Sequence, residues 1–379
     1  MSRSEQAGAP RQAGASLPRV FFEDLRRTRF GRDYWRPLHD LYVFYLDEES
    51  RARLANMGRL RRAFLQLGWL MRSMLMKLSP ARRIMILLSL MLTILGNTSL
   101  MFLGWGFSTD LHLWGWVLLL LTLMLELKDK LLARDEIQIA RDVQIALQPQ
   151  RQPTVPGWSF WCYTRPANDV GGDLVDYLTL DGFRHGVALG DVAGKGLGAA
   201  LLSAKLQATL RALVPEAVSL DELGARVNAI FHRDGIDNRY ATLFYAEVEH
   251  NSGRVRYLNA GHNPPLVIRA NGVERLRASS FPLGMLPRVA YEEGRLDLAP
   301  GDVLLVYSDG LTEASNPSGE EFGSGRLEAV VPRLRGLSPA AVGELLLVEV
   351  DRFLGDARAS DDLSLVVVRR DEPLSTRGH

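Results

Sequence analysis

Two long apolar runs lie close together near the middle of the first half of the chain, and any fold must give both an apolar environment. Residues 84–103 carry no charge, and residues 107–125 carry one, Asp110. A helix needs roughly 20 apolar residues to cross a bilayer. The sequence therefore predicts a transmembrane hairpin of two helices over residues 84–127. A buried helical hairpin of a soluble protein is the alternative.

The charges that flank the two runs predict an orientation. Arg82 and Arg83 precede the pair, Lys128, Lys130 and Arg134 follow it, and the connection holds no lysine or arginine. Because positively charged flanks stay on the cytoplasmic side, we expect a multi-pass protein of the inner membrane with its N-terminus and its C-terminal domain in the cytoplasm. The runs begin too far into the chain to be a cleavable signal peptide.

The part that precedes the hairpin is strongly basic. Residues 1–83 hold 17 lysine and arginine residues against 8 acidic ones, a net charge of +9, whereas the remainder holds 28 against 36, a net charge of −8. We expect a disordered tail over residues 1–18 and a basic helical cytoplasmic region over residues 19–83. The basic face either lies on the membrane surface or packs on its own domain, and we expect no nucleic-acid partner.

A helical connector follows the hairpin over residues 128–150. Residues 127–148 contain neither glycine nor proline, and Pro149 ends the stretch. Leu132, Ile139 and Ala146 are spaced seven apart, which suits a short coiled coil and is compatible with a homodimer through this helix.

From Trp158 onward short β-rich runs alternate with turn signals. Helical stretches are expected at residues 199–213, 220–234 and 339–354. Eight strands are expected, within residues 159–166, 174–180, 184–191, 240–250, 254–261, 264–270, 302–310 and 363–370. This order predicts an α+β sandwich rather than alternating βαβ units, in a domain of residues 151–371 that a tail of residues 372–379 follows.

Aspartates stand at the ends of several apolar strands, often beside glycine. The five that stand out are Asp173, Asp191, Asp309, Asp361 and Asp362. Mg²⁺ and Mn²⁺ prefer oxygen ligands that converge from separate elements. Two such ions roughly 3.5–4 Å apart can activate a water toward a phosphorus atom without a covalent nucleophile. The pattern predicts a site for two divalent metal ions.

Other phosphate and metal sites fit the sequence poorly. The "GDVAGKG" turn lacks the spacing of a nucleotide-binding GxxxxGK[ST] loop, and no dinucleotide fingerprint opens a helix after a strand. Cys162 is the single cysteine, so a cysteine-rich zinc site is excluded. His262 is either a loop histidine bonded to the backbone or a part of the site.

The ordered motifs resemble one family. From about Ala140 to Arg370 the chain is similar to the SpoIIE-type branch of the metal-dependent PPM phosphatases, relatives of protein phosphatase 2C. The motifs that carry the resemblance are "ARDVQIALQP", "PANDVGGDLVDY", "GVALGDVAGKGLGAALLSA", "ATLFYAEVE", "VRYLNAGHNPPLV", "FPLGM", "LAPGDVLLVYSDGLTEASNPSGEEFG" and "SDDLSLVVV".

The resemblance implies a PPM-type β-sandwich of two antiparallel sheets flanked by helices, with two Mn²⁺ or Mg²⁺ ions at one edge. Asp173 and Asp191 would be ligands, with Asp191 bridging the ions and the Val192 carbonyl contributing. Asp309 and Asp361 would complete the site, and Asp362 is a further candidate. Asp191 and Asp309 are the two we expect to be essential for catalysis.

The resemblance also implies a function: removal of phosphate from serine or threonine of a bacterial regulatory protein, such as an anti-sigma-factor antagonist with a STAS domain. The connector helix would be the natural place for regulation. Two alternatives remain at this point: a catalytically degenerate PPM domain that serves as a membrane-bound interaction module, and a hydrolase that acts on a small phosphorylated metabolite.

Overall fold

The computed structural model describes residues 68, 71–102, 105–149, 155–234, 239–250, 252–276 and 280–372. The tail predicted over residues 1–18, most of the basic region predicted over residues 19–83 and nearly all of the C-terminal tail lie outside these residues. Of the basic region, residues 71–77 are helical. The chain divides into two compact units, Met1–Lys130 and Leu131–His379.

The apolar hairpin is shorter in its first helix than the sequence predicts. Helix α5 spans Pro80–Leu95, and helix α6 spans Leu111–Leu147. Between them β1 (Asn97–Phe102) and β2 (Trp105–Asp110) form an antiparallel two-stranded ribbon. The helix expected to continue to residue 103 ends early because Gly96 caps it with a φ of 65° and donates its N–H to the Leu92 carbonyl. Asn, Thr and Ser follow, and these residue types are poor inside helices.

Small and hydroxyl-bearing residues join the two apolar helices. Ser89 donates its Oγ–H to the Gly115 carbonyl at 2.7 Å. A Cβ atom on Gly115 would lie 2.4 Å from Thr93 Oγ1, so glycine is required for this approach. Arg82 of α5 pairs with Glu126 at 2.8 Å. These contacts resemble the close packing of membrane helices.

Two helices among the described residues are long and apolar enough to cross a membrane by length and composition: Leu111–Leu147, with 11% of its most apolar window buried, and Leu197–Glu216, with 44% buried. The second contributes to the core of the sandwich described below. Helix α5 has 16 residues, about 24 Å of helix at 1.5 Å per residue. That is less than the roughly 30 Å of bilayer hydrocarbon.

The second unit contains two five-stranded antiparallel sheets. One has the order β10-β7-β6-β5-β4, and the other has the order β3-β12-β11-β8-β9. The eight expected strands are all present, whereas β9 and β10 were not expected. The strands are β3 (Trp158–Arg165), β4 (Leu174–Thr179), β5 (Arg184–Val192), β6 (Ala241–Glu249), β7 (Arg254–Ala260), β8 (Leu266–Arg269), β9 (Gly272–Arg275), β10 (Glu293–Asp297), β11 (Val303–Tyr307) and β12 (Leu363–Arg370).

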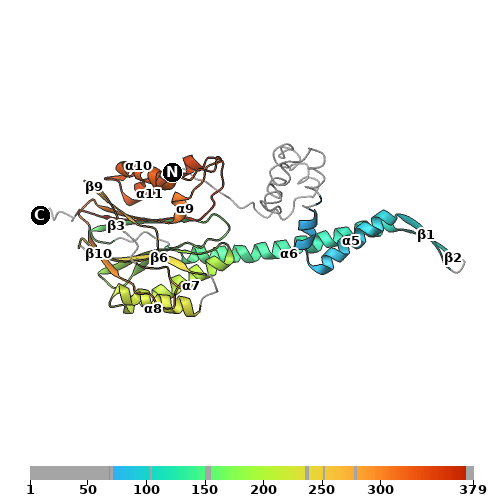
Figure 1. Ribbon diagram of the computed structural model, residues 1–379, viewed down its shortest axis with the longest axis horizontal. Helices are drawn as coiled ribbons and strands as arrows, with labels where there is room; N and C mark the ends of the chain where they lie inside the picture. The colour runs from blue at the N-terminus through green and yellow to red at the C-terminus, as the bar shows by residue number, and fades with distance from the viewer. Residues whose placement is uncertain are drawn as a thin grey trace, which may run out of the picture. The chain divides into compact units, whose positions relative to one another are not determined.

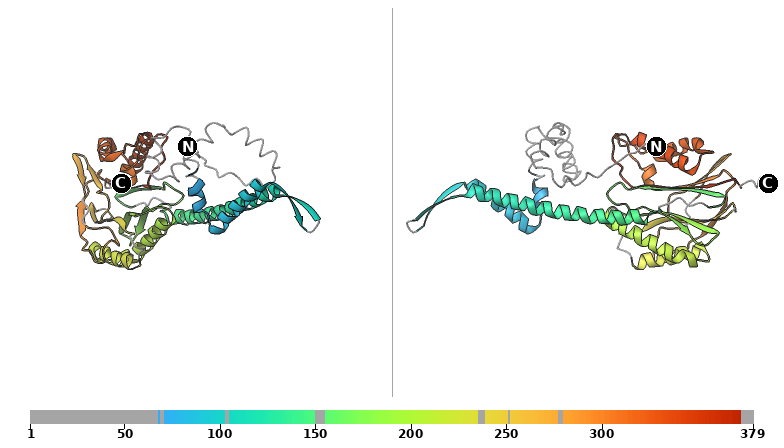
Figure 2. Two further views of the ribbon diagram at one scale, coloured as in Figure 1. Left: turned by 45° about the vertical axis from the view of Figure 1, so that its right-hand side comes forward. Right: turned by 180° about the vertical axis from the view of Figure 1, so that it is seen from behind.

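Helices cover the outer face of each sheet, as Figures 1 and 2 show. One sheet carries α7 (Leu197–Leu213) and α8 (Leu220–Arg233), and the other carries α10 (Gly323–Leu334) and α11 (Pro339–Leu354). Short α9 (Asp309–Thr312) follows β11, and the 3-10 turn η1 (Val214–Glu216) follows α7. The expected helices at residues 199–213, 220–234 and 339–354 are confirmed, and α10 was not expected.

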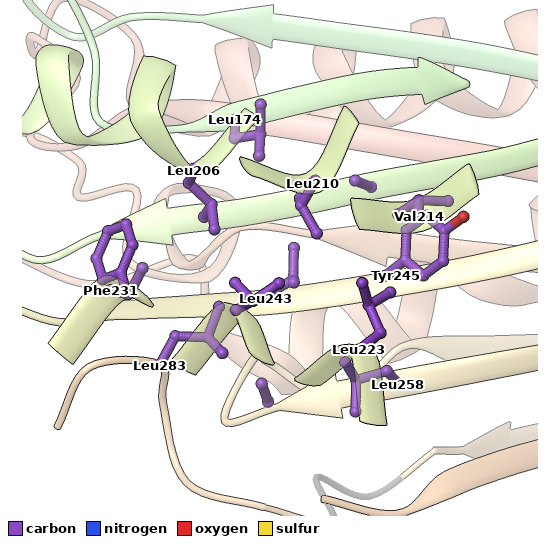
Figure 3. Close-up of a cluster of buried hydrophobic side chains, with 14 of the residues drawn as sticks. Leu174, Leu206, Leu210, Val214, Leu223, Phe231, Leu243, Tyr245, Leu258 and Leu283 are labelled. Carbon is purple, nitrogen blue, oxygen red and sulfur yellow. The ribbon is translucent and has the colours of Figure 1, made fainter. Parts of the chain in front are cut away.

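Three apolar layers hold this sandwich together: one lies between the two sheets, and one lies between each sheet and the helices that cover it. Between the sheets, alternate residues such as Val187, Phe244 and Val366 face one another. Beneath the first sheet, leucines of α7 and Phe231 of α8 pack on Leu243 and Tyr245 of β6 (Figure 3). The α+β fold with two antiparallel sheets flanked by helices is therefore as predicted. Burial on this scale fixes the strand register, because a one-residue slip would turn every apolar side chain outward.

Candidate metal centre

The strand pairings bring the predicted acidic residues to one edge of the sandwich. In the first sheet Leu174 of β4 lies opposite Gly190 of β5, so Asp173 and Asp191 are neighbours. In the second sheet Tyr307 of β11 lies opposite Leu365 of β12. This pairing puts Asp309, which follows β11, beside the pair that precedes β12, Asp361 and Asp362.

Burial, together with repulsion between the carboxylates, shifts the pKa values of Asp191 and Asp309. Burial, then Asp309, Asp361, Asp362 and Glu313, raise the pKa of Asp191 from 3.8 to about 7. Burial, then Glu313 and Asp361, raise the pKa of Asp309 to about 6. Such shifts identify groups that a nearby cation would stabilise in their charged form.

Asp173 is the most buried member of the group, with 7% of its surface exposed. Burial first, then the charge of Asp191, raise its pKa well above 3.8. Its Oδ2 atom has no hydrogen-bond partner. A buried carboxylate oxygen without a partner is costly unless a cation or another donor meets it.

Asp362 has a different environment from the other acids. Its carboxylate accepts backbone N–H groups from Ala167 at 2.8 Å and from Gly172 at 2.6 Å. Its own carbonyl accepts the Ser308 hydroxyl at 3.0 Å. Asp362 therefore ties the loop that carries Asp173, in the first sheet, to the turn between β11 and α9 in the second sheet.

Asp361 pairs with a lysine from the glycine turn after Asp191. The Nζ of Lys195 lies 3.2 Å from Asp361 Oδ2 and donates to the Ser360 carbonyl at 2.6 Å. Within the part of the chain that the structure describes, no three His, Cys, Asp or Glu side chains stand close enough to form a complete ligand cluster.

The donor set nevertheless suits a hard divalent cation. A Cβ on Gly172 would lie 3.0 Å from the Val192 carbonyl oxygen and 3.7 Å from Asp191 Oδ1, so both oxygens face a space that only glycine leaves open. The unpartnered oxygen of Asp173 belongs to the next residue. Carboxylate and carbonyl oxygens are the ligands that Mg²⁺ and Mn²⁺ take. The oxygens of Asp173, Asp191 and Val192 thus suit a hard divalent cation, and Asp309 and Asp361 stay predicted ligands.

An arginine holds the turn that follows Asp191. Arg239 donates from Nη1 to the Ala193 carbonyl at 2.8 Å, and the Ala193 N–H donates to the Tyr240 carbonyl at 2.9 Å. A Cβ on Gly194, whose φ is 113°, would lie 1.8 Å from this Nη1 atom. The glycine therefore gives the guanidinium room, and the peptide after Val192 is fixed from both sides.

The connector end of α6 touches the same edge from within the second unit. Gln144 donates to the Gly171 carbonyl at 2.8 Å and accepts the Gly171 N–H at 3.1 Å. A mostly apolar cavity of about 140 Å³ lies between this helix end and α7, and Asp173 is among its lining residues. The connector is thus in direct contact with the loop that carries a predicted ligand.

Sequence reasoning missed three charged residues of this edge. Glu313 lies four residues after Asp309, a helical spacing that could have revealed it, and Lys195 is four residues after Asp191. Arg239 is separated from the turn in sequence and gave no signal. His262, the other residue singled out, is buried and bonds Thr242 Oγ1 at 2.9 Å through Nδ1, and burial lowers its pKa to about 4, so it is a packed neutral histidine.

Comparison with known proteins places this edge in context. Residues 181–371 match the family model described as Stage II sporulation protein E (SpoIIE). Over 268 residues the chain is 27% identical to Protein IcfG of Synechocystis sp., covering 62% of this chain and 42% of that protein. Over 190 residues it is 28% identical to Phosphoserine phosphatase RsbP of Bacillus subtilis, covering 48% and 47%. The chain thus spans less than half the length of these two relatives.

A solved structure shares the fold. The SiaA-PP2C domain of Pseudomonas aeruginosa superimposes with a TM-score of 0.56 at 19% identity, over 64% of this chain and 99% of that domain. At this identity the likeness concerns the arrangement of sheets and helices. It agrees with the two-sheet sandwich found here.

Proposed function

The chain belongs to the SpoIIE family, and from this premise we propose that it is a metal-dependent phosphatase that removes phosphate from serine or threonine side chains of another protein. The observation that carries the proposal is the edge where Asp173, Asp191, Asp309 and Asp361 meet. These acids come from four strand ends in two sheets, and one of them holds a buried oxygen without a partner. The relative RsbP carries phosphoserine phosphatase in its name.

The residues of the edge have separable roles in this proposal. Asp173, Asp191, Asp309 and Asp361, with the Val192 carbonyl, would hold two Mn²⁺ or Mg²⁺ ions. The bound ions would supply an activated water and charge neutralisation for the phosphate. In the reaction the water oxygen bonds to phosphorus, the bond from phosphorus to the serine oxygen breaks, and that oxygen takes a proton.

Asp362, in this proposal, positions the loop that carries Asp173 and does not itself bind the metal. Its carboxylate is occupied by the amides of Ala167 and Gly172, so it fixes the loop that presents Asp173. These hydrogen bonds hold the orientation of the carboxylate and partly offset its burial, which raises the pKa of Asp362. We therefore assign Asp362 a positioning role and leave the metal to the other four acids.

The substrate we propose is a phosphorylated bacterial regulatory protein, such as an anti-sigma-factor antagonist with a STAS domain. The apolar hairpin would tether the enzyme to the inner membrane, with the sandwich on the cytoplasmic side. The connector end of α6 would carry regulation, because Gln144 contacts the Asp173 loop directly. Dimerisation through the same helix would change that contact.

The experiment that tests the activity uses the full-length chain in detergent, with p-nitrophenyl phosphate and a phosphoserine peptide as substrates. We expect hydrolysis that requires Mn²⁺ or Mg²⁺ and stops with a chelator. Asp191→Asn and Asp309→Asn should lose turnover by a factor of roughly a thousand while remaining folded. Wild-type protein that is folded, binds no Mn²⁺ and hydrolyses neither substrate would overturn the proposal.

The protein substrate can be found by comparing cells. Phosphoproteomics of cells that carry the wild-type chain and of cells that carry Asp191→Asn should reveal a phosphoserine or phosphothreonine that accumulates only in the variant. Accumulation of a phosphorylated small metabolite with no change in phosphoproteins would contradict a protein substrate.

A further inference from the structure

Lys195 lies at the edge of the sandwich where the candidate metal ligands gather. Its positive charge cannot serve as a metal ligand, so it needs another explanation. It lies in the turn between β5 and α7, between Gly194 and Gly196, whose φ values are 113° and 74°. Its side chain is 59% exposed. Its Nζ lies 3.2 Å from Asp361 and 2.6 Å from the Ser360 carbonyl. The turn thus carries a cation to the rim of the acidic cluster.

The hydrogen-bonding capacity of this ammonium is only partly used. A lysine ammonium has three N–H donors and no acceptor. The Ser360 carbonyl accepts one of them, and the Asp361 carboxylate forms an ion pair with the ammonium. One donor remains for an anion, and the long exposed stem allows Nζ to move by several ångströms without a change in the backbone.

Arg239, the other cation of this turn, is placed differently. Its guanidinium lies against Gly194 and donates to the Ala193 carbonyl at 2.8 Å. That contact fixes the turn and commits the side chain to the protein. Lys195, by contrast, extends from the same turn with most of its side chain in solvent.

A cation at the rim would add to the charge neutralisation that bound metal ions would supply. The carboxylates of Asp309, Asp361, Asp362 and Glu313 all disfavour a negative charge on Asp191. A phosphate dianion that approached the same edge would meet the same repulsion, which falls off slowly in a partly buried site. A mobile ammonium at the rim would lower that barrier and would bind one phosphate oxygen.

We propose that Lys195 is a substrate-binding residue, whose ammonium binds the phosphate group of the phosphoprotein and of the released inorganic phosphate. The inference rests on the proposed phosphatase function. The competing explanation is that Lys195 only neutralises Asp361. The two differ in what removal of the charge changes: phosphate affinity in the first case, and metal affinity alone in the second.

The test compares three full-length variants in detergent: Lys195→Met, Lys195→Arg and, as a matched control ten residues along in α7, Lys205→Met. Lys205 pairs with Asp234 at 3.8 Å, and Asp234 is not one of the candidate metal ligands. KM and kcat are measured with a phosphoserine peptide, the inhibition constant is measured with inorganic phosphate, and Mn²⁺ affinity is measured by calorimetry. Thermal unfolding establishes that each variant is folded.

We expect Lys195→Met to raise KM and the phosphate inhibition constant together by about tenfold or more, as for loss of a hydrogen bond to a charged group. Lys195→Arg should keep both within about threefold, since the charge and donors are retained. Lys205→Met should change neither. An inhibition constant that is the same in Lys195→Met and wild type, whatever happens to Mn²⁺ affinity, would overturn the inference. Wild-type protein with no hydrolysis would instead overturn the phosphatase proposal and this inference with it.

Discussion

The protonation of Asp191 depends strongly on what surrounds it. Its pKa is about 7 in the fold against 3.8 ordinarily. Without metal, the folded chain therefore binds more protons than the unfolded chain between about pH 4 and pH 7. The free energy of unfolding must fall as pH rises through that window and then level off. The acidic edge is thus a source of instability that bound cations would remove.

Asp191→Asn should accordingly stabilise the protein while abolishing its activity. In a chelating buffer at pH 8 we expect a gain of roughly 2 kcal/mol in the free energy of unfolding of the sandwich, and little change at pH 4. Urea unfolding at both pH values measures this. Asp181→Asn is the control and should lower the free energy of unfolding at pH 8, because Arg184 and backbone amides lower the pKa of Asp181 to about 2. A loss of stability at pH 8 for Asp191→Asn would contradict the repulsion described here.

Gly194 tests the contact with Arg239. Gly194→Ala should cost about 2–3 kcal/mol, since it adds strain at positive φ and would displace the guanidinium from the Ala193 carbonyl. Gly196→Ala has positive φ but open space around it, so strain alone should cost about 1–2 kcal/mol. In a double-mutant cycle Arg239→Ala should recover part of the Gly194→Ala loss. Equal costs at the two glycines, with no recovery, would exclude the contact.

At the scale of elements, α11 provides a prediction about how closely a helix lies on its sheet. A Cβ on Gly343 would come within 2.0 Å of the ring of Trp161 in β3. Gly343→Ala should therefore destabilise the sandwich by about 2 kcal/mol although alanine favours helix. Gly325→Ala in α10, where nothing lies within 4 Å, should be neutral or stabilising by up to about 1 kcal/mol. Thermal unfolding of both variants shows whether the contact with Trp161 or the higher helix propensity of alanine dominates the change in stability.

The strands that carry the site were predictable because their alternation and turns are local signals. Asp173, Asp191, Asp309 and Asp361 could be placed at strand ends from the sequence, and the structure brings those ends together. Two of the four edge strands, β9 and β10, are short and have no buried residue, so they lack an apolar pattern. Arg239 could not be foreseen, since its partner Ala193 is reached only through the pairing of β5 with β6.

The apolar hairpin shows that hydropathy does not predict where a helix ends within an uncharged run. Residues 84–103 carry no charge and are mostly apolar, so hydropathy alone predicted one long helix. Gly96 ends the helix through its backbone conformation, which a hydropathy average does not register. The β-ribbon that follows is therefore a consequence of local turn chemistry within an apolar run.

At the scale of the whole chain, the proposed membrane tether makes a direct prediction. The full-length protein should sediment with membranes and remain there after washing with alkaline carbonate. Deletion of residues 84–127 should release it into the soluble fraction with Mn²⁺-dependent hydrolysis retained. Complete extraction of the intact chain by carbonate would contradict an integral anchor and favour a buried hairpin.

The position of β12 limits when, during synthesis, the second sheet can be completed. This strand is the last one described along the chain, yet it lies in the middle of its sheet between β3 and β11, and the turn before it carries Asp361 and Asp362. A nascent chain emerging from the ribosome would expose its apolar hairpin long before that turn is made. The acids of the second sheet could therefore join those of the first only after the turn before β12 has been synthesised.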